Sequence, residues 1–287
     1  MNFLWFVIIA VCAYFLGNVS FARIFARFKK QDITKLGSGN PGTTNVIRNY
    51  GFLPGVLTLL GDALKGAIPA IVGFYVYGGP AGGVEALLAL YGAGFAAILG
   101  HIYPVFYKFK GGKGMATTLG VFAVADPLIM LIVLAILFVI VLFSDYISIG
   151  SLLLVTIFTL IEVSKIPDTA DPALSMVVRL IIFGIFAITW FAFRSNIFRL
   201  LVGKENKANL KRAISKLKKA EIKKEKQTKK LEIETLKARL MEDKKARKLD
   251  AKIKSGKKIS KSSKKISKTS KTTKKKEAPL GQMPSNV

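Results

Sequence analysis

Hydrophobic and polar residues are unevenly divided along this chain. Long apolar runs with few charges fill residues 1–203, whereas charged residues dominate from residue 204 onward. A helix of about 20 apolar residues spans the hydrocarbon core of a bilayer, and charges inside such a run are costly. The first two thirds of the chain are therefore predicted to form an all-α, polytopic membrane protein.

Six apolar runs are candidates for membrane-spanning helices. They cover residues 1–22, 52–84, 86–107, 115–144, 146–161 and 173–193. The fourth run is interrupted by Asp126-Pro127, where proline disfavours the continuation of a helix. Splitting the run there predicts seven helices. The shortest, 115–125, is only about 16 Å long and cannot cross a bilayer alone.

The first run, 1–22, has two possible interpretations, a cleaved signal peptide or a retained span. The run lacks the basic segment with which a signal peptide starts, and four basic residues follow it within 23–30. This pattern favours a retained span. Cys12, the only cysteine, lies in the run, so disulfides within the chain and zinc–thiolate clusters are excluded. Its predicted role is apolar packing.

The basic residues of the body predict its topology. Positively charged loops favour the cytoplasmic side of a membrane, and the clusters lie at 23–48, at 108–113 and from 194 onward. Seven spans place all three clusters on one side, because an even number of spans then separates them. We therefore expect a multi-pass protein of the plasma membrane with its N-terminus outside and its C-terminal tail in the cytoplasm.

The net charge of +27 is concentrated after residue 203. Residues 204–287 contain 30 Lys and Arg against 9 Asp and Glu, whereas residues 1–203 contain 14 and 8. We predict a membrane domain at 1–203, a basic and partly helical extension at 204–250 and a disordered Lys/Ser/Thr-rich tail at 251–287. Anionic lipid would attract such a tail. Nucleic acid is not an expected partner, since no aromatic residues are interleaved with the charges.

A polar, glycine-rich stretch, GSGNPGTTNVIRN at 37–49, separates two apolar runs. Glycine lets the backbone approach a ligand and present N–H groups, and arginine offers a planar fork suited to phosphate. The hydroxyl and amide side chains add further hydrogen-bonding groups. The candidate binding residues are Gly37, Ser38, Gly39, Asn40, Gly42, Thr43, Asn45 and Arg48.

Two further polar stretches fall on the same predicted side of the membrane. FKGGKGMATTLG at 109–120 surrounds Lys113 with glycines before a helix, an arrangement that favours anion binding, although the Walker A spacing is absent. RSNIFRLLVGKEN at 194–206 contributes cationic, amide and acidic side chains. Together the three stretches indicate a phosphate-bearing ligand; the alternative is that the glycines only turn the chain and the cations only anchor it. The candidates are Gly111, Gly112, Lys113, Gly114, Arg194, Asn196, Arg199 and Glu205.

Asp62, Lys65 and His101 are ionisable residues inside apolar runs. Asp62 and Lys65 are three residues apart and share a helix face, so they form either a functional pair or a structural ion pair. His101, the only histidine, is either a structural hydrogen-bonding residue or part of the site. No Ser-His-Asp or Cys-His arrangement can be assembled, and metal ligands are scarce. We therefore expect no metal and no cofactor, and a substrate that arrives already activated.

Three stretches carry a family resemblance. GSGNPGTTNVIRNYG, GHIYPVFYKFKGGKGMATTLGV and RSNIFRLLVGKEN resemble motifs of the bacterial acyl-phosphate:glycerol-3-phosphate acyltransferase family, and LTLLGDALKGAIPA at 57–70 resembles its second helix. The resemblance covers about residues 1–206. It implies a seven-helix membrane enzyme with a cytoplasmic active site that transfers an acyl chain from acyl phosphate to the sn-1 hydroxyl of glycerol 3-phosphate. The products would be lysophosphatidic acid and phosphate, in the first step of phospholipid synthesis.

The resemblance also implies roles for individual residues. Ser38, Arg48, Lys113 and Asn196 would bind glycerol 3-phosphate, and backbone N–H groups of Gly111, Gly112 and Gly114 are our candidates for binding the acyl-phosphate head. Because phosphate is the leaving group of a mixed anhydride, the enzyme needs no nucleophile of its own. A monomer is expected. The further possible site residues are Asp62, Lys65, His101, Arg194 and Glu205.

One position departs from the family pattern. The third motif usually begins with His-Arg, whereas this chain has Phe193-Arg194, so Arg194 or Ser195 is a candidate replacement for the histidine. Glu205 is expected to tie a helix end to a loop rather than to act in catalysis. Two other functions remain open: a phosphate-coupled carrier, because such proteins use broken helices and intramembrane charges, and a scaffold that recruits partners through its tail.

Overall fold

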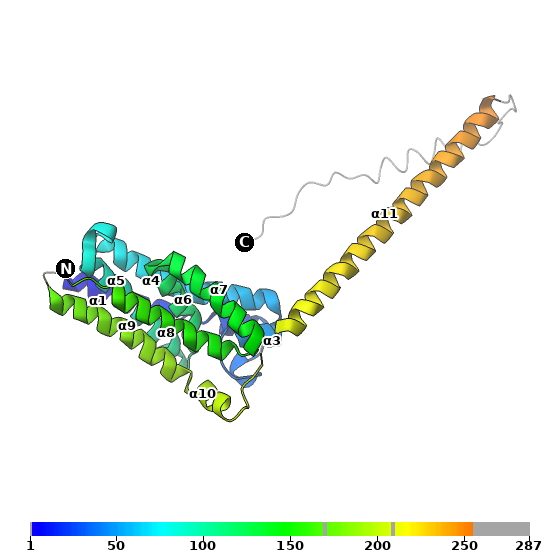
Figure 1. The fold of residues 1–287 in the computed structure, drawn as a ribbon. Helices are drawn as coiled ribbons and strands as arrows, with labels where there is room; N and C mark the ends of the chain where they lie inside the picture. The colour runs from blue at the N-terminus through cyan, green and yellow to red at the C-terminus, as the bar shows by residue number, and fades with distance from the viewer. Residues whose placement is uncertain (1, 169–170, 208–209, 255–287) are drawn as a thin grey trace. The chain divides into compact units, whose positions relative to one another are not determined.

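The computed structural model describes residues 2–168, 171–207 and 210–254. Within these ranges all regular secondary structure is helical, which confirms the all-α prediction (Figure 1). The α-helices are α1 (Phe3–Gly17), α2 (Phe21–Phe28), α3 (Thr43–Tyr50), α4 (Phe52–Val76), α5 (Gly83–Ile102), α6 (Met115–Ala125), α7 (Pro127–Ser144), α8 (Ile147–Lys165), α9 (Pro172–Ala192), α10 (Arg194–Leu201) and α11 (Leu210–Lys254). Short 3-10 helices occupy η1 (Ile33–Lys35), η2 (Gly79–Gly82) and η3 (Val105–Tyr107).

Six helical segments of the described chain are long and apolar enough to cross a membrane. They are Phe3–Phe28, Phe52–Val76, Gly79–Tyr107, Pro127–Ser144, Ile147–Lys165 and Pro172–Ala192. The seventh predicted span is α6, which is apolar but has only 11 residues. The seven-span topology and its orientation therefore stay predictions, whereas a membrane protein with several apolar helices is established.

The chain breaks between α6 and α7 where the sequence predicts it. Helix α7 starts with Pro127, and the Asp126 carboxylate caps it by accepting a hydrogen bond from the backbone N–H of Ile129 at 2.9 Å. Asp126 also pairs with Lys165 at the end of α8. Lys165 in turn lies 3.1 Å from the carboxylate of Glu162. The broken helix is thus tied to α8 by charged groups that partner one another.

Helix α6 crosses α4 at close range because glycines face the backbone of the partner helix. A Cβ on Gly66 of α4 would lie 2.1 Å from the carbonyl oxygen of Thr117 in α6. A Cβ on Gly120 of α6 would lie 1.9 Å from the carbonyl oxygen of Ala63 in α4. Small residues allow membrane helices to make such contacts. This packing fixes α6, and with it the glycine-rich loop that precedes it.

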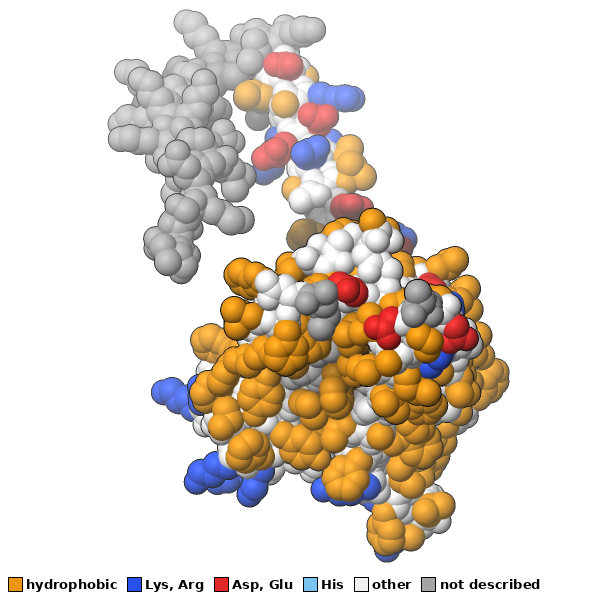
Figure 2. Space-filling model, turned by 90° about the vertical axis from the view of Figure 1, so that its left-hand side faces the viewer, with side chains coloured by type: hydrophobic (Ala, Val, Ile, Leu, Met, Phe, Trp, Pro, Cys, Tyr) orange, Lys and Arg blue, Asp and Glu red, His pale blue; other side chains and the backbone are white. Residues whose placement is uncertain are grey.

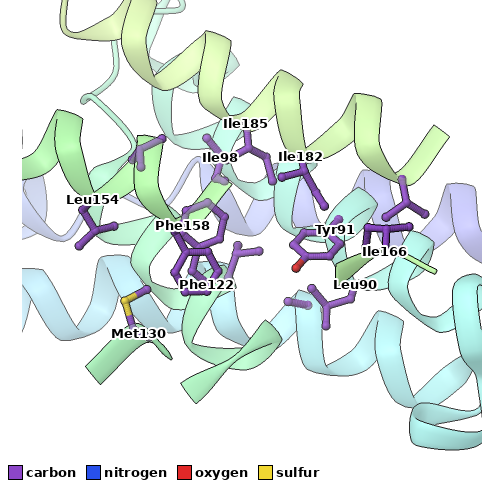
Figure 3. Packing of buried hydrophobic residues seen from close by; sticks show 14 of the residues in the cluster. Leu90, Tyr91, Ile98, Phe122, Met130, Leu154, Phe158, Ile166, Ile182 and Ile185 are labelled. Atoms are coloured by element: carbon purple, nitrogen blue, oxygen red, sulfur yellow. The ribbon is translucent and has the colours of Figure 1, made fainter. Parts of the chain in front are cut away.

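The hydrophobic core joins α5, α6, α7, α8 and α9 (Figure 3). Phe122 of α6 stacks on Phe158 of α8, with ring centroids 4.2 Å apart and an angle of 11° between the rings. Ile98 of α5 and Ile182 and Ile185 of α9 are completely buried beside them. The closely packed core holds in place the helices that carry the polar loops at their ends.

The outside of the bundle is also apolar. Large side chains such as Phe143, Leu128 and Phe3 are more than half exposed. Hydrophobic side chains dominate the face seen in Figure 2, where Lys and Arg lie mainly at the margins. A hydrophobic surface of this extent is unfavourable in water and is typical of contact with lipid.

The chain divides into two compact units, Met1–Lys211 and a second unit that begins at Arg212. The second unit contains most of α11, whose described side chains are exposed. This helix overlaps most of the predicted extension 204–250. The predicted disordered tail lies almost entirely in 255–287, outside the described residues, and the three-part domain division stays a prediction.

Candidate functional site

Residues from all three polar stretches lie around one cavity of about 720 Å³. The first stretch contributes its loop and α3, the second contributes the start of α6, and the third contributes α10 and the residues after it. The candidate residues that line the cavity are Ser38, Asn40, Gly42, Thr43, Asn45, Arg48, Asp62, His101, Lys113, Gly114, Asn196, Arg199 and Glu205. The structure thus brings together segments that are more than 150 residues apart in sequence.

Asn45 organises the first loop from the inside. Its side-chain oxygen accepts hydrogen bonds from the backbone N–H of Ser38 at 3.1 Å and from the Asn49 amide at 3.1 Å. Its amide nitrogen donates to the carbonyl oxygens of Ile33 and Leu36 at 3.3 and 2.9 Å. The side chain is buried and its hydrogen-bonding capacity is used within the protein. Although Asn45 lines the cavity, it holds the loop in shape, which argues against the prediction that it binds the ligand.

Gly37 and Gly39 shape the same loop rather than line the cavity. Both have positive φ angles, +54° and +71°, which favour glycine. A Cβ on Gly37 would also lie 2.4 Å from the side-chain oxygen of Asn45. The glycines are needed for backbone conformation and for the approach of Asn45. The polar groups that the loop presents to the cavity come instead from Ser38, Thr43 and Arg48.

The second loop is held by the end of α5. The N–H groups of Gly111 and Gly112 donate to the carbonyl oxygens of Ile102 and His101, each at 3.1 Å. Neither glycine lines the cavity. These protein partners argue against the prediction that the two N–H groups bind the acyl-phosphate head. Gly114, with φ +77°, does line the cavity and precedes the first turn of α6, so the candidate anion-binding backbone starts there.

Asp62, Lys65 and His101 form a buried cluster beside the cavity. Lys65 Nζ lies 2.9 Å from Asp62 Oδ1 and donates to the carbonyl oxygen of Val19 at 2.7 Å. His101 Nδ1 lies 3.8 Å from the same carboxylate oxygen. The His101 ring packs so tightly under Gly112 that a Cβ there would lie 2.2 Å from Nε2. Lys65 does not line the cavity. Through its hydrogen bond to Val19, the charge pair joins α4 to the chain between α1 and α2.

Glu205 joins α10 of the third stretch to the start of α8. Its side chain is only 5% exposed and accepts hydrogen bonds from Asn196 Nδ2 at 2.6 Å, Arg199 Nε at 2.8 Å and Ser148 Oγ at 3.0 Å. Burial alone would raise the pKa of the Glu205 carboxyl, but the three hydrogen bonds outweigh it and bring the pKa below its usual value. These bonds give Glu205 the geometry of a structural tie.

Arg194 lies outside this arrangement. Its guanidinium donates to the carbonyl oxygen of Phe191 at 3.1 Å and stacks 4.5 Å from the Phe191 ring centroid. The residue is exposed and does not line the cavity. The prediction that Arg194 belongs to the site therefore disagrees with its placement, because its side chain is held against the end of α9. Ser195, the other candidate replacement for the histidine, does not line the cavity either.

Lys113 is a partly buried cation at the cavity. Burial lowers its pKa, and repulsion from Arg199 and Arg48 lowers it further, while Glu205 acts in the opposite direction; the pKa falls to about 8. Among the lining side chains near Lys113, three cations, Arg48, Lys113 and Arg199, face the single carboxylate of Glu205. The polar part of the cavity therefore has an excess of positive charge and suits an anion.

The cavity continues into an apolar recess. The walls of the recess come from the C-terminal half of α7 and the N-terminal half of α8, together with α4 and α6. Gly150 lets α8 pack closely against α7 at this wall, because a Cβ on it would lie 2.7 Å from Val141. The apolar lining residues are Leu59, Met115, Leu119, Leu134, Leu137, Phe138, Val141, Ile147 and Leu154.

Several lining residues were not among the sequence candidates. Ser148 contacts Glu205, and its only sequence signal was a hydroxyl at the start of an apolar run. Phe193 lines the cavity with a buried aromatic ring. Asn206 follows Glu205 and had no distinct signal.

Fold and site together define an integral membrane protein of several apolar helices with a cationic cavity that opens into an apolar recess. The family model described as glycerol-3-phosphate acyltransferase matches residues 7–203. Proteins of that name from Finegoldia magna and Halalkalibacterium halodurans are each 40% identical, over 72% of this chain and 98% and 97% of their own. The chain belongs to the glycerol-3-phosphate acyltransferase family.

Solved structures agree with this assignment. The crystal structure of PlsY (YgiH), an integral membrane glycerol 3-phosphate acyltransferase, in its glycerol 3-phosphate form is 35% identical, with a TM-score of 0.63 over 70% of this chain and 94% of that one. Its lysophosphatidic acid form gives a TM-score of 0.61 with the same identity and coverage. The family match ends at residue 203, so it does not extend into the basic tail.

Proposed function

We propose that the protein transfers an acyl chain from acyl phosphate to the sn-1 hydroxyl of glycerol 3-phosphate and releases lysophosphatidic acid and inorganic phosphate. The observation that carries the proposal is a single cavity with two different parts. Arg48, Lys113 and Arg199 line one part, and apolar side chains of α7 and α8 line the other. An anionic head and an acyl chain match these two environments. The PlsY structures in glycerol 3-phosphate and lysophosphatidic acid forms support glycerol 3-phosphate as the acceptor and lysophosphatidic acid as the product.

The reaction needs little chemistry from the side chains. The hydroxyl oxygen of glycerol 3-phosphate attacks the carbonyl carbon of acyl phosphate, a new C–O bond forms, and the bond from that carbon to the phosphate oxygen breaks. The hydroxyl proton leaves on a phosphate oxygen of a substrate. Arg48, Lys113 and the first turn of α6 would align the two anions and stabilise the developing negative charge. Ser38 and Asn196 would position glycerol 3-phosphate.

We further propose that this end of the bundle faces the cytoplasm, in the plasma membrane, and that the enzyme acts as a monomer. The basic residues near the cavity favour the cytoplasmic side. The cavity walls described above all come from one chain.

The test is turnover by the purified protein in detergent. Palmitoyl phosphate and glycerol 3-phosphate should give phosphate and lysophosphatidic acid in equal amounts, whereas palmitoyl-CoA in a parallel reaction should give neither. Equal turnover from palmitoyl-CoA would refute the choice of donor. No turnover from either donor by folded protein would overturn the proposed reaction and favour a carrier instead.

The lowered pKa of Lys113 predicts an alkaline limit to substrate capture. Lys113 is charged below about pH 8 and becomes neutral as the pH rises through that value, so its hold on an anion is lost. At saturating acyl phosphate, kcat/KM for glycerol 3-phosphate should fall by about tenfold per pH unit above pH 8. The measurement is kcat/KM between pH 6.5 and 9.5. In Lys113→Arg, which stays protonated, this decline should disappear; an unchanged decline would assign it to another group.

The basic tail is predicted to be dispensable for the reaction. A chain that ends after Lys211, the last residue of the first unit, should keep specific activity within about twofold of the full chain, because the lining residues described above all lie before that point. The measurement is specific activity of both proteins in the same detergent, with thermal unfolding as the check on folding.

A shorter chain supplies the matched control. Ending after Lys204 removes Glu205 and also Lys207, whose carbonyl oxygen accepts a hydrogen bond from Arg48 Nη2 at 3.2 Å. That chain should lose activity. Loss of activity in the chain ending after Lys211, when it is folded, would show instead that the tail takes part in turnover.

A further inference from the structure

Phe193 occupies a fixed position between α9 and α10. Its backbone N–H donates to the carbonyl oxygen of Thr189 at 3.1 Å, and its own carbonyl oxygen accepts from the N–H of Asn196 at 2.8 Å. The side chain is 5% exposed and lines the cavity. The backbone bonds fix where the side chain starts, and burial restricts the movement of the ring. The same backbone also forms the start of the helix that carries Asn196.

The face of this ring is turned to Lys113. The ammonium nitrogen lies 4.8 Å from the ring centroid, within the range of a cation–π interaction. Among the described residues, the Lys113 side chain has no hydrogen bond or ion pair to a protein group, whereas Lys65, which is more deeply buried, has both. Lys113 is thus held by an aromatic face and not by a carboxylate.

The difference matters for a cation that binds an anion. A carboxylate would neutralise the ammonium and use its N–H donors, so a ligand would have to displace it. An aromatic ring orients the ammonium but leaves its charge and its three donors available. The ring also excludes water, which strengthens the attraction between the ammonium and a phosphate.

We propose that Phe193 is a positioning residue that fixes the Lys113 ammonium for capture of glycerol 3-phosphate through its ring face. This rests on the proposed function, in which Lys113 binds that substrate. Phe193 touches neither substrate in this role and acts only through Lys113. The ring also stabilises the charged form of Lys113 against the burial and the neighbouring arginines that lower its pKa.

The test replaces the ring and keeps the apolar volume. Phe193→Leu should raise KM for glycerol 3-phosphate between about 3- and 30-fold, with kcat and KM for palmitoyl phosphate within about twofold of the unaltered protein. Phe193→Tyr keeps the aromatic face and should behave as the unaltered protein. The alkaline decline of kcat/KM should begin at lower pH in Phe193→Leu, because the charged lysine has lost its stabilising ring.

A double substitution tests whether the effect passes through Lys113. In Lys113→Ala, adding Phe193→Leu should change KM no further, since no ammonium remains to be positioned. Equal KM values for the Leu and Tyr variants and the unaltered protein would reduce Phe193 to a packing residue. A loss in kcat alone would place its effect on the transition state, and an effect that persists without Lys113 would also overturn the proposal.

The two proposals fail in different ways. If the unaltered, folded protein does not turn over palmitoyl phosphate and glycerol 3-phosphate, the proposed function is wrong. If it does, and Phe193→Leu leaves KM unchanged, only the role of Phe193 is wrong. Phe193→Met provides a second ring-free variant if the leucine variant does not give a folded protein by thermal unfolding, and the same KM increase is expected of it.

Discussion

Replacing Arg48 with alanine should lower kcat/KM for glycerol 3-phosphate by about 1,000-fold. Arg48 lines the cavity from α3, and the hydrogen bond described for its side chain, Nη2 to the Lys207 carbonyl oxygen, leaves the other guanidinium donors for a ligand. The residue is exposed, so its removal should affect folding little. Arg48→Lys keeps the charge but loses the planar fork, and about a tenth to a hundredth of the activity should remain.

Arg194→Ala is the matched control for this prediction. It removes the same charge from the neighbourhood of the third stretch, but Arg194 stacks on Phe191 and does not line the cavity. Its kcat/KM should stay within about twofold of the unaltered protein. The measurement is steady-state kinetics of the three variants with palmitoyl phosphate saturating. Similar losses in Arg48→Ala and Arg194→Ala would mean that net positive charge, and not a bound guanidinium, is what the reaction requires.

The membrane fold was largely predictable from the sequence because lipid imposes a simple rule on it. Charge-free runs gave the approximate positions of the apolar helices, and Asp126-Pro127 marked the break between α6 and α7. The place of α6 in the bundle was not predictable. It depends on Gly66 and Gly120, and only the assembled structure shows which backbone each glycine faces.

The site was predictable as a set of loops but not as a set of contacts. Glycine, amide and arginine residues indicated anion binding, and the three stretches do meet at one cavity. The sequence could not tell which polar groups the protein uses internally. Asn45 and the N–H groups of Gly111 and Gly112 have protein partners, since the folded chain brings carbonyl oxygens within reach of them.

The apolar recess had no sequence signal of its own. In a membrane protein a helix is hydrophobic on the side that faces lipid and also on the side that faces an apolar cavity, so periodicity does not separate the two. Leu137 of α7 is 4% exposed and lines the cavity, whereas its neighbour Phe138 is 55% exposed and also lines it. Only the packing of α7 against α8 distinguishes Leu137 and Phe138 from residues such as Leu131, which does not line the cavity.

Replacing Glu205 with alanine should both destabilise the protein and abolish most activity. The side chain is buried, and its loss leaves Arg199, Asn196 and Ser148 without their shared acceptor. Because Arg199 is 31% exposed and partly solvated, we expect a cost of about 2 kcal/mol, below the usual range for a fully buried pair. Since α10 then loses its tie to α8 and Asn196 loses its orientation, kcat/KM should fall by about 100-fold.

Glu205→Gln separates shape from charge. Glutamine keeps an acceptor oxygen for Asn196 or Ser148 but cannot pair with the Arg199 guanidinium, so activity and thermal stability should fall between those of the unaltered protein and the alanine variant. The measurements are kcat/KM and the unfolding temperature in detergent. Asp168→Asn is the control, because Asp168 also pairs with an arginine, Arg179, but is 82% exposed, and it should change neither quantity appreciably.

The pH dependence of stability should identify the carboxylate. The pKa of Glu205 is lower in the folded protein than its usual value of 4.5. Its contribution to the free energy of unfolding is therefore fully present above that usual value and is lost as the pH falls through the folded pKa. Between pH 7 and a pH well below 4.5, the stability advantage of the unaltered protein over Glu205→Gln should therefore decrease. If the difference in unfolding temperature stays constant over that range, the carboxylate charge contributes nothing and Glu205 acts only through its shape.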